Sequence, residues 1–139
     1  MPDINLSSSM EDYIKTIYLL ENLNKVARVS DIGRRLSVKK ASVVAAVSYL
    51  QKNELIRHER YGFITLTDLG REIASKIEKK YGMVYEFLSA FLKIDPEKAK
   101  DEACLIEHSL SDDTASKLAG YIKSNRQTPA KKINRKARK

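Results

Sequence analysis

Residues 29–53 constrain the fold of this chain more than any other segment. Ser30 is a typical N-cap for a short helix that ends near Leu36, and residues 37–40 leave room only for a tight connection. A second helix to about Asn53 is predicted by an apolar stripe at i, i+4 and i+7, formed by Val43, Val47 and Leu50. Two helices joined in this way predict a helix-turn-helix.

The opposite face of this second helix carries small or basic side chains, namely Ala41, Ala45, Ser48 and Lys52. Small residues are an odd choice for a face that only meets water, but they suit a helix that lies close against something. A recognition helix needs this pattern, because basic residues near its start hold phosphates and compact side chains approach base edges. The residues predicted to face a DNA major groove are Lys39, Lys40, Ala41, Ser42 and Ala45.

Residues 55–66 are predicted to form two short strands around a turn at residues 60–62, which is the β-hairpin wing that follows many helix-turn-helix units. Arg57, Arg60 and Tyr61 are expected beside the DNA backbone, where the two arginines contact phosphate or enter a minor groove. His58 is more simply a solvated strand residue.

Helix start signals recur along the rest of the chain. Residues 9–12, Ser-Met-Glu-Asp, fit a capping box, and Thr67 caps a long helix that runs toward Leu92. Gly70 and Gly82 lie inside that helix and mark close packing or a bend. Two further helices are expected, one opened by Asp95-Pro96 and one capped by Ser111.

We therefore expect a mainly α fold with a winged helix-turn-helix domain at residues 1–72, joined by the long helix to an all-helical domain at 73–124. Residues 125–139 are expected to be a basic, disordered tail. The chain has 139 residues and a net charge of +8, and the eight Lys and Arg residues of 123–139 account for that excess. Such a tail either binds nucleic acid non-specifically or is a solvated terminus.

The rest of the chain is divided by charge. Residues 25–60 hold nine basic residues against three acids, whereas residues 95–113 hold seven acids against two lysines. The first segment suits phosphate and the second suits cations. No apolar stretch is long enough for a membrane span, no secretory signal is visible, and a single cysteine suits a reducing cytoplasm.

Cys104, Glu107 and His108 stand at i, i+3 and i+4 in an expected helix, so their side chains share one face. Thiolate, carboxylate and imidazole together can bind a divalent transition metal and leave a coordination position for a partner from elsewhere. The simpler alternative is a small buried cysteine followed by two surface polar residues.

These segments resemble the diphtheria toxin repressor family of metal-dependent transcription regulators. Residues 9–14 resemble the first helix of that family, residues 27–32 the entry to its helix-turn-helix, and residues 101–104 with 107–108 its metal-binding helix. The resemblance covers about residues 7–124. In length the chain is similar to the manganese-transport-regulator branch, and it ends before the SH3-like domain of longer members could form.

The resemblance implies a set of metal ligands. Asp12 matches a ligating Asp of the manganese branch, although it also occupies the N3 position of the expected capping box. Glu107 and His108 match ligands found in both branches, and Cys104 matches the iron branch. The metal implied is Fe²⁺ or Mn²⁺, with Zn²⁺ or Co²⁺ possible in vitro because a thiolate favours softer ions.

Three departures from the family pattern concern its second metal position. Lys15 stands where the manganese branch has a ligating Glu, Tyr81 where both branches have a ligating His, and Lys100 where the iron branch has another His. An ammonium group cannot ligate a cation and repels it. We therefore expect one metal per chain.

The resemblance implies a transcriptional regulator, most simply a cytoplasmic repressor of metal-homeostasis genes. It would act as a homodimer on a palindromic double-stranded DNA operator, with no membrane partner and no enzymatic activity. The main alternative is a metal-independent winged-helix regulator with a degenerate site. Two others are an enzyme using Cys104 and His108 as a thiolate–imidazolium pair, and a nucleic-acid coating protein acting through the tail.

Overall fold

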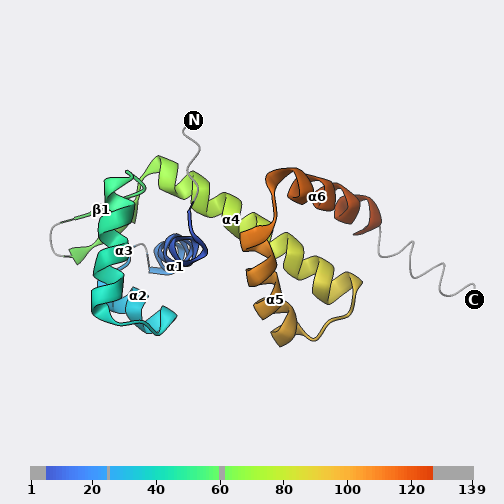
Figure 1. Ribbon diagram of the computed structural model, residues 1–139, viewed down its shortest axis with the longest axis horizontal. Helices are drawn as coiled ribbons and strands as arrows, with labels where there is room; N and C mark the ends of the chain where they lie inside the picture. Colours follow the sequence, from blue (N-terminus) through green and yellow to red (C-terminus); the bar gives the residue numbers. More distant parts are fainter. Residues whose placement is uncertain (1–5, 25, 60–61, 127–139) are drawn as a thin grey trace, which may run out of the picture. The chain divides into compact units, whose positions relative to one another are not determined.

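The structure, a computed structural model, describes residues 6–24, 26–59 and 62–126. It confirms the expected mainly α class, with a winged helix-turn-helix followed by a helical domain (Figure 1). Two compact units meet within a helix, one comprising residues up to Lys79 and the other starting at Lys80. The boundary expected at residues 72 and 73 also falls within that helix. None of the helices in the described residues is both long and apolar enough to cross a membrane.

The first unit begins with α1 (Ser8–Asn24), α2 (Val29–Leu36) and α3 (Lys40–Lys52). The buried face of α3 carries the expected stripe together with one further residue, as Val43, Ala46, Val47 and Leu50. These side chains pack with the fully buried Ile14, Ile17 and Ile32 of α1 and α2. The predicted helix-turn-helix is therefore built around a single apolar core.

Two expected helix caps are wrong. The α1 cap is Ser7, whose Oγ accepts the Met10 backbone N–H at 3.2 Å, so the capping box at residues 9–12 does not form. Helix α2 starts two residues earlier than expected, with Arg28 rather than Ser30 at the N-cap position and no side-chain cap hydrogen bond, which places Ser30 inside its first turn. At α1 three serines lie in a row, and the side chains alone do not say which of them starts the helix.

The wing is an antiparallel pair of strands, β1 (Ile56–His58) and β2 (Ile64–Leu66), with Arg57 opposite Thr65. Ala27 forms an isolated bridge to Ile64. Figure 1 shows the hairpin beside α3. The two strands are as predicted, while the turn residues 60 and 61 lie outside the described residues.

One carboxylate ties the wing to the helices of this unit. Glu21 of α1 accepts the backbone N–H of Leu66 at 2.9 Å and also pairs with Arg71 of α4. The Glu21 side chain is only 11% exposed and the Arg71 side chain 47%, so the contact with the Leu66 amide is the more shielded of the two. A partly buried carboxylate that accepts a backbone amide and an arginine holds three elements in register.

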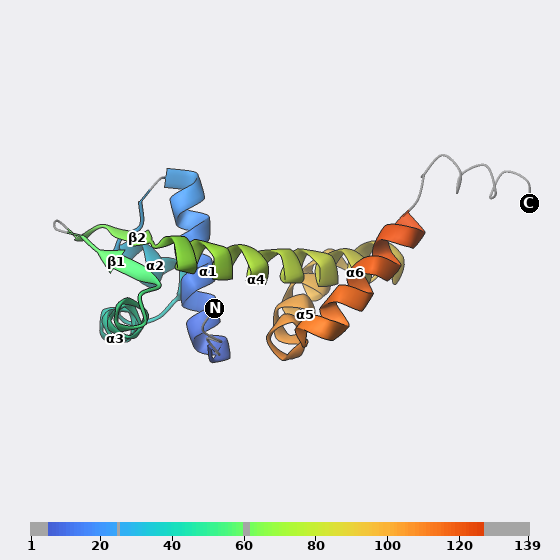
Figure 2. The same ribbon diagram turned by 90° about the horizontal axis from the view of Figure 1, so that it is seen from above.

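The second unit contains the later part of α4 (Asp68–Glu86), a π-helical segment η2 (Phe87–Phe91), α5 (Pro96–Ser109) and α6 (Asp112–Arg126) (Figure 2). Its core is formed by Val84, Leu88, Ala99 and Ala103. The expected caps of these helices are present, because Thr67, Asp95 and Ser111 each accept a backbone N–H three residues ahead. Helix α6 continues past the expected end at residue 124 to Arg126, whose guanidinium pairs with both carboxylate oxygens of Glu86.

The two glycines of α4 have different roles. A Cβ added at Gly70 would lie 1.9 Å from the carbonyl oxygen of Leu55, so the start of α4 lies directly against the backbone before β1. A Cβ added at Gly82 would meet nothing within 4 Å. Gly70 therefore marks close packing, whereas Gly82 occupies an open helix surface.

These surroundings predict opposite effects on stability. Gly70→Ala should lower the free energy of unfolding by about 1–3 kcal/mol or more, because backbone must move to admit the methyl group. Gly82→Ala should raise it by about 0.5–1 kcal/mol, because alanine costs less backbone entropy in a helix. Chemical denaturation of both variants measures the difference. Equal effects of the two substitutions would contradict the close approach at Gly70.

Candidate metal centre and nucleic-acid surface

Helix α5 carries the cysteine, glutamate and histidine singled out in the sequence. Asp95 caps it by accepting the Lys98 backbone N–H at 3.3 Å, and Pro96 occupies the first turn. Its buried face consists of Ala99, Ala103 and Glu107, at spacings of four residues. A carboxylate therefore continues a line of alanines, in a position where an apolar residue would otherwise be expected.

The three polar side chains lie against one another. His108 Nε2 is 3.8 Å from Cys104 Sγ, and His108 Nδ1 is 3.4 Å from a carboxylate oxygen of Glu107. Two atoms that ligate the same metal at about 2.0–2.3 Å each lie roughly 3–4 Å apart. Each separation suits a cation shared by that pair, but the two contacts use different ring nitrogens, and one imidazole gives a metal only one of them, so in this conformation the three ligand atoms do not face a single point.

Burial adds to this geometry. The Glu107 residue is 1% exposed, and the His108 side chain is 12% exposed. An ionised carboxylate is costly to bury unless hydrogen bonds or a nearby positive charge compensate it. Thiolate, imidazole and carboxylate are ligand types that suit a transition metal, and a divalent cation bound beside His108 would place a positive charge next to this carboxylate.

The end of α5 is fixed by a lysine from α4. Lys80 Nζ donates to the carbonyl oxygen of Leu110 at 2.9 Å and lies 3.4 Å from a carboxylate oxygen of Asp112. Its side chain is only 15% exposed. Leu110 follows His108 by two residues. This contact therefore holds the connection to α6 and also the last turn of α5, which carries His108.

Lys100 and Tyr81, which stand where the family pattern has ligands of a second metal, carry side chains that are poorly suited to bind a cation. Lys100 lies one helical turn before Cys104 and pairs with Glu97 at 3.3 Å. The hydrogen bond to Glu97, followed by the attraction of that carboxylate, raises the pKa of Lys100, so this side chain remains an ammonium ion. Tyr81 stacks with Tyr85 at a ring separation of 6.3 Å and carries a phenol in place of an imidazole.

Asp12 belongs to the first unit, within α1. The alternative role expected for it, as the N3 residue of a capping box that starts at Ser9, is removed because Ser7 caps this helix. The metal-ligand role implied by the resemblance stays a prediction.

The residues predicted to face DNA are exposed where the structure describes them. Lys39 is the N-cap of α3, and the side chains of Lys40, Ala41, Ser42 and Ala45 lie on its exposed surface. Arg57 is exposed on β1, while Arg60 and Tyr61 lie outside the described residues. Val44, absent from the predicted set, is 48% exposed on the same helix between Ala41 and Ser48.

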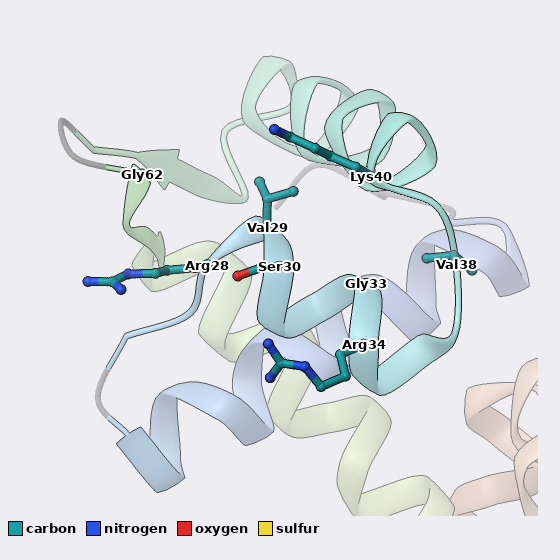
Figure 3. Close-up of a pocket in the computed structure, with 8 residues that line it drawn as sticks. All are labelled: Arg28, Val29, Ser30, Gly33, Arg34, Val38, Lys40 and Gly62. Atoms are coloured by element: carbon teal, nitrogen blue, oxygen red, sulfur yellow. The ribbon is translucent and has the colours of Figure 1, made fainter.

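A pocket that the sequence did not predict opens beside the start of α3. It has a volume of about 600 Å³ and is lined by Arg28, Val29, Ser30, Gly33, Arg34, Val38, Lys40 and Gly62. Figure 3 shows that these residues come from the beginning of α2, the connection to α3 and the hairpin. The surplus of basic residues in the segment 25–60 was the only signal for it, and that signal does not say which of them converge.

Both parts of the chain match the models of one protein family. Residues 5–64 match the family model described as the N-terminal DNA-binding domain of iron dependent repressors, and residues 67–134 match the model of their metal binding and dimerisation domain. The chain belongs to the iron-dependent repressor family. The expected resemblance to diphtheria toxin repressors is thereby confirmed.

Individual relatives of this repressor family agree. The chain is 35% identical over 118 residues to an HTH-type transcriptional regulator of Methanocaldococcus jannaschii, covering 84% of this chain and 94% of that protein. It is 33% identical over 129 residues to the HTH-type transcriptional regulator MntR of Bacillus subtilis, covering 93% and 90%.

Solved structures show the same fold. IdeR of T. acidophilum has a TM-score of 0.72 and 28% identity over 81% of this chain, and the manganese regulator SloR has a TM-score of 0.74 and 26% identity over 82%. The chain spans about half the length of both, 53% in each case.

The cluster on α5 predicts how this repressor-family chain binds metal. His108→Ala should weaken binding of Mn²⁺ or anaerobic Fe²⁺ by roughly 10- to 100-fold or more, because it removes a ligand flanked by two others. His58→Ala is the matched control, since His58 is the other histidine and is exposed on β1. Titration calorimetry without DNA measures both. Equal losses in the two variants, or no loss in His108→Ala, would remove the α5 cluster from metal binding.

Proposed function

We propose that this protein is a metal-dependent DNA-binding transcriptional repressor of metal-homeostasis genes, acting in the cytoplasm. The observation that carries the proposal is the presence in one chain of a winged helix-turn-helix with a basic exposed surface and of the clustered Cys104, Glu107 and His108. Both halves match the corresponding domains of iron dependent repressors.

The ligands proposed for the metal are Asp12 together with Cys104, Glu107 and His108. The metal is Fe²⁺ or Mn²⁺, and each chain holds one, because Lys100 and Tyr81 replace groups that a second ion would need. When bound, the cation supplies coordination energy that a ligand from the first domain shares with three from the second. That energy would favour one orientation of the DNA-binding domain.

The DNA partner proposed is a palindromic operator read by a homodimer. A two-fold pair of recognition helices contacts half-sites about one helical turn apart. The matched dimerisation domain supports the dimer. By thermodynamic reciprocity, a metal that tightens DNA binding must itself be bound more tightly when DNA is present, typically by about 1–3 kcal/mol.

A second function is favoured by the departures at Lys100 and Tyr81, namely metal-independent regulation through the same winged helix. Metal removal separates the two. We expect EDTA to abolish selective binding to an operator chosen from random duplexes, and added Mn²⁺ or anaerobic Fe²⁺ to restore it. Fluorescence anisotropy with a scrambled duplex as control measures this. Operator binding that persists in EDTA would establish the metal-independent alternative.

The coupling between domains has its own test in Asp12→Asn, which keeps the side-chain shape and removes the charge. This variant should still bind metal through the α5 cluster but should lose most of the metal stimulation of operator binding. Glu72→Gln is a suitable control, because it removes a carboxylate from exposed α4 surface. Calorimetry for metal and anisotropy for operator distinguish the two properties. Full metal-activated binding by Asp12→Asn would refute the shared-ligand mechanism.

A further inference from the structure

The exposed side of α3 between residues 41 and 48 has no side chain that reads a base by paired hydrogen bonds. The exposed residues there are small or apolar, namely Ala41, Ser42, Val44, Ala45 and Ser48. In the major groove, Arg, Lys, Asn and Gln make bidentate contacts with purines, and Asp and Glu accept from cytosine, whereas serine bonds to more than one kind of base. None of those six discriminating residue types occurs at positions 41–48. Apolar contact is therefore the main way in which this part of α3 could distinguish one base from another.

Val44 is the largest apolar side chain among these exposed residues, and 48% of the residue is accessible to solvent. It stands three residues after Ala41 and four before Ser48, so the three side chains lie on one side of the helix. The inward face of α3 is made of other residues, which are Val43, Ala46, Val47 and Leu50. Val44 therefore belongs to the side of α3 that we propose enters the major groove.

The fold gains little from a valine at position 44. A half-exposed side chain contributes less to the core than the buried residues of the same helix. Valine is also a weaker helix former than alanine, because its branched Cβ restricts the first side-chain torsion, and alanine is present at positions 41 and 45. Single exposed apolar residues are common on protein surfaces and need no explanation by themselves. Val44 is distinguished by its place on the helix proposed to read DNA.

We propose that Val44 is a specificity-determining residue that recognises the 5-methyl group of one thymine in each operator half-site. The proposal rests on the DNA-binding function proposed above and adds the chemistry by which the operator is read. Thymine carries a methyl group in the major groove, and an apolar side chain can contact it without a hydrogen bond. The small side chains of Ala41 and Ala45 let the helix approach the groove closely, so that a short side chain such as valine can reach a base edge. Its methyl groups are held in one preferred rotamer in a helix, which limits the entropy lost on contact.

The first experiment locates the methyl group. It uses the full-length protein with saturating Mn²⁺ and an operator selected from random duplexes, in which each thymine is replaced in turn by deoxyuridine. This replacement removes the methyl group and keeps every hydrogen-bonding group of the base. Wild-type affinity, measured by fluorescence anisotropy, should fall roughly three- to fivefold at one thymine per half-site, as expected when one methyl group is no longer buried. A series in which no replacement weakens binding would overturn the proposal.

The second experiment tests whether Val44 makes that contact. Val44→Ala should be insensitive to deoxyuridine at the sensitive position and should respond like wild type at all others. Leu23→Ala is the matched control, because Leu23 is an exposed aliphatic residue on α1, and this variant should keep the full loss at that position. An undiminished loss in Val44→Ala would overturn the proposal, because two groups in contact must show coupled effects. Thermal unfolding checks the fold, and the Tm of Val44→Ala should equal or exceed that of wild type because alanine is the better helix former.

The third experiment repeats the operator selection with Val44→Ala and separates two kinds of failure. This variant should lose the preference for thymine at the sensitive position and keep the preferences at the other positions. An unchanged preference for thymine there would overturn the role of Val44 and leave the proposed regulator intact. If wild type with Mn²⁺ or anaerobic Fe²⁺ selects no operator at all, the proposed function itself fails, and the role of Val44 fails with it.

Discussion

The candidate metal centre depends on one physical constraint, which is that the carboxylate of Glu107 is held in the interior of the protein. Along α5, the face that packs inward uses alanine at positions 99 and 103, and the next residue on that line is an acid with 1% exposure. Lys80 and Asp95 hold the two ends of this helix, so the carboxylate cannot easily turn toward water. A fold optimised only for stability would place an apolar residue there, because burying a paired charge contributes little to stability. The buried acid is therefore consistent with the ligand role proposed for it.

The DNA-binding domain depends on a different carboxylate. Glu21 contacts the amide of Leu66 and the guanidinium of Arg71, and thereby holds α1, β2 and α4 together. Phe63, immediately before β2, lies under Arg28. The wing is a hairpin of two three-residue strands, which would be marginal by itself. Its attachment to Glu21 and Ala27 fixes its position, and Gly62 of this hairpin region lines the pocket beside α2.

Much of this arrangement could be predicted from local patterns. The α3 stripe, the hairpin strands and the caps at Thr67, Asp95 and Ser111 are short-range features, and the structure has all of them. The α1 cap could not be predicted because Ser7 and Ser9 are chemically equivalent. The α2 cap could not be predicted because Arg28 makes no side-chain cap hydrogen bond, whereas Ser30 is a preferred capping residue. The π-helical turn at residues 87–91 has no sequence rule that would have located it.

The α5 cluster and the pocket beside α2 and α3 also differ in whether local sequence patterns could predict them. Cys104, Glu107 and His108 could be found because one turn of helix brings them together, and the spacing alone places them on one face. The pocket could not be found, because Arg28 and Lys40 come together only when a turn, two helices and a hairpin are packed. Spacing also did not indicate that Glu107 would be the buried member of the cluster and Cys104 a partly exposed one.

The division of charge along the chain also bears on how metal could control DNA binding. The acids around α5 attract cations and the basic residues of α2 and α3 attract phosphate, so each ligand is directed to its own domain. Long-range electrostatic attraction alone couples the two domains only weakly, because at physiological salt the electric field of a charge is screened within about 8 Å. A ligand set drawn from both domains avoids this loss, since coordination bonds to one ion act directly on the residues that they join. For that reason, the proposed coordination by the single carboxylate of Asp12 would have a larger effect on regulation than all the acidic residues around α5. Those acids attract the cation, but they do not by themselves orient the recognition helix.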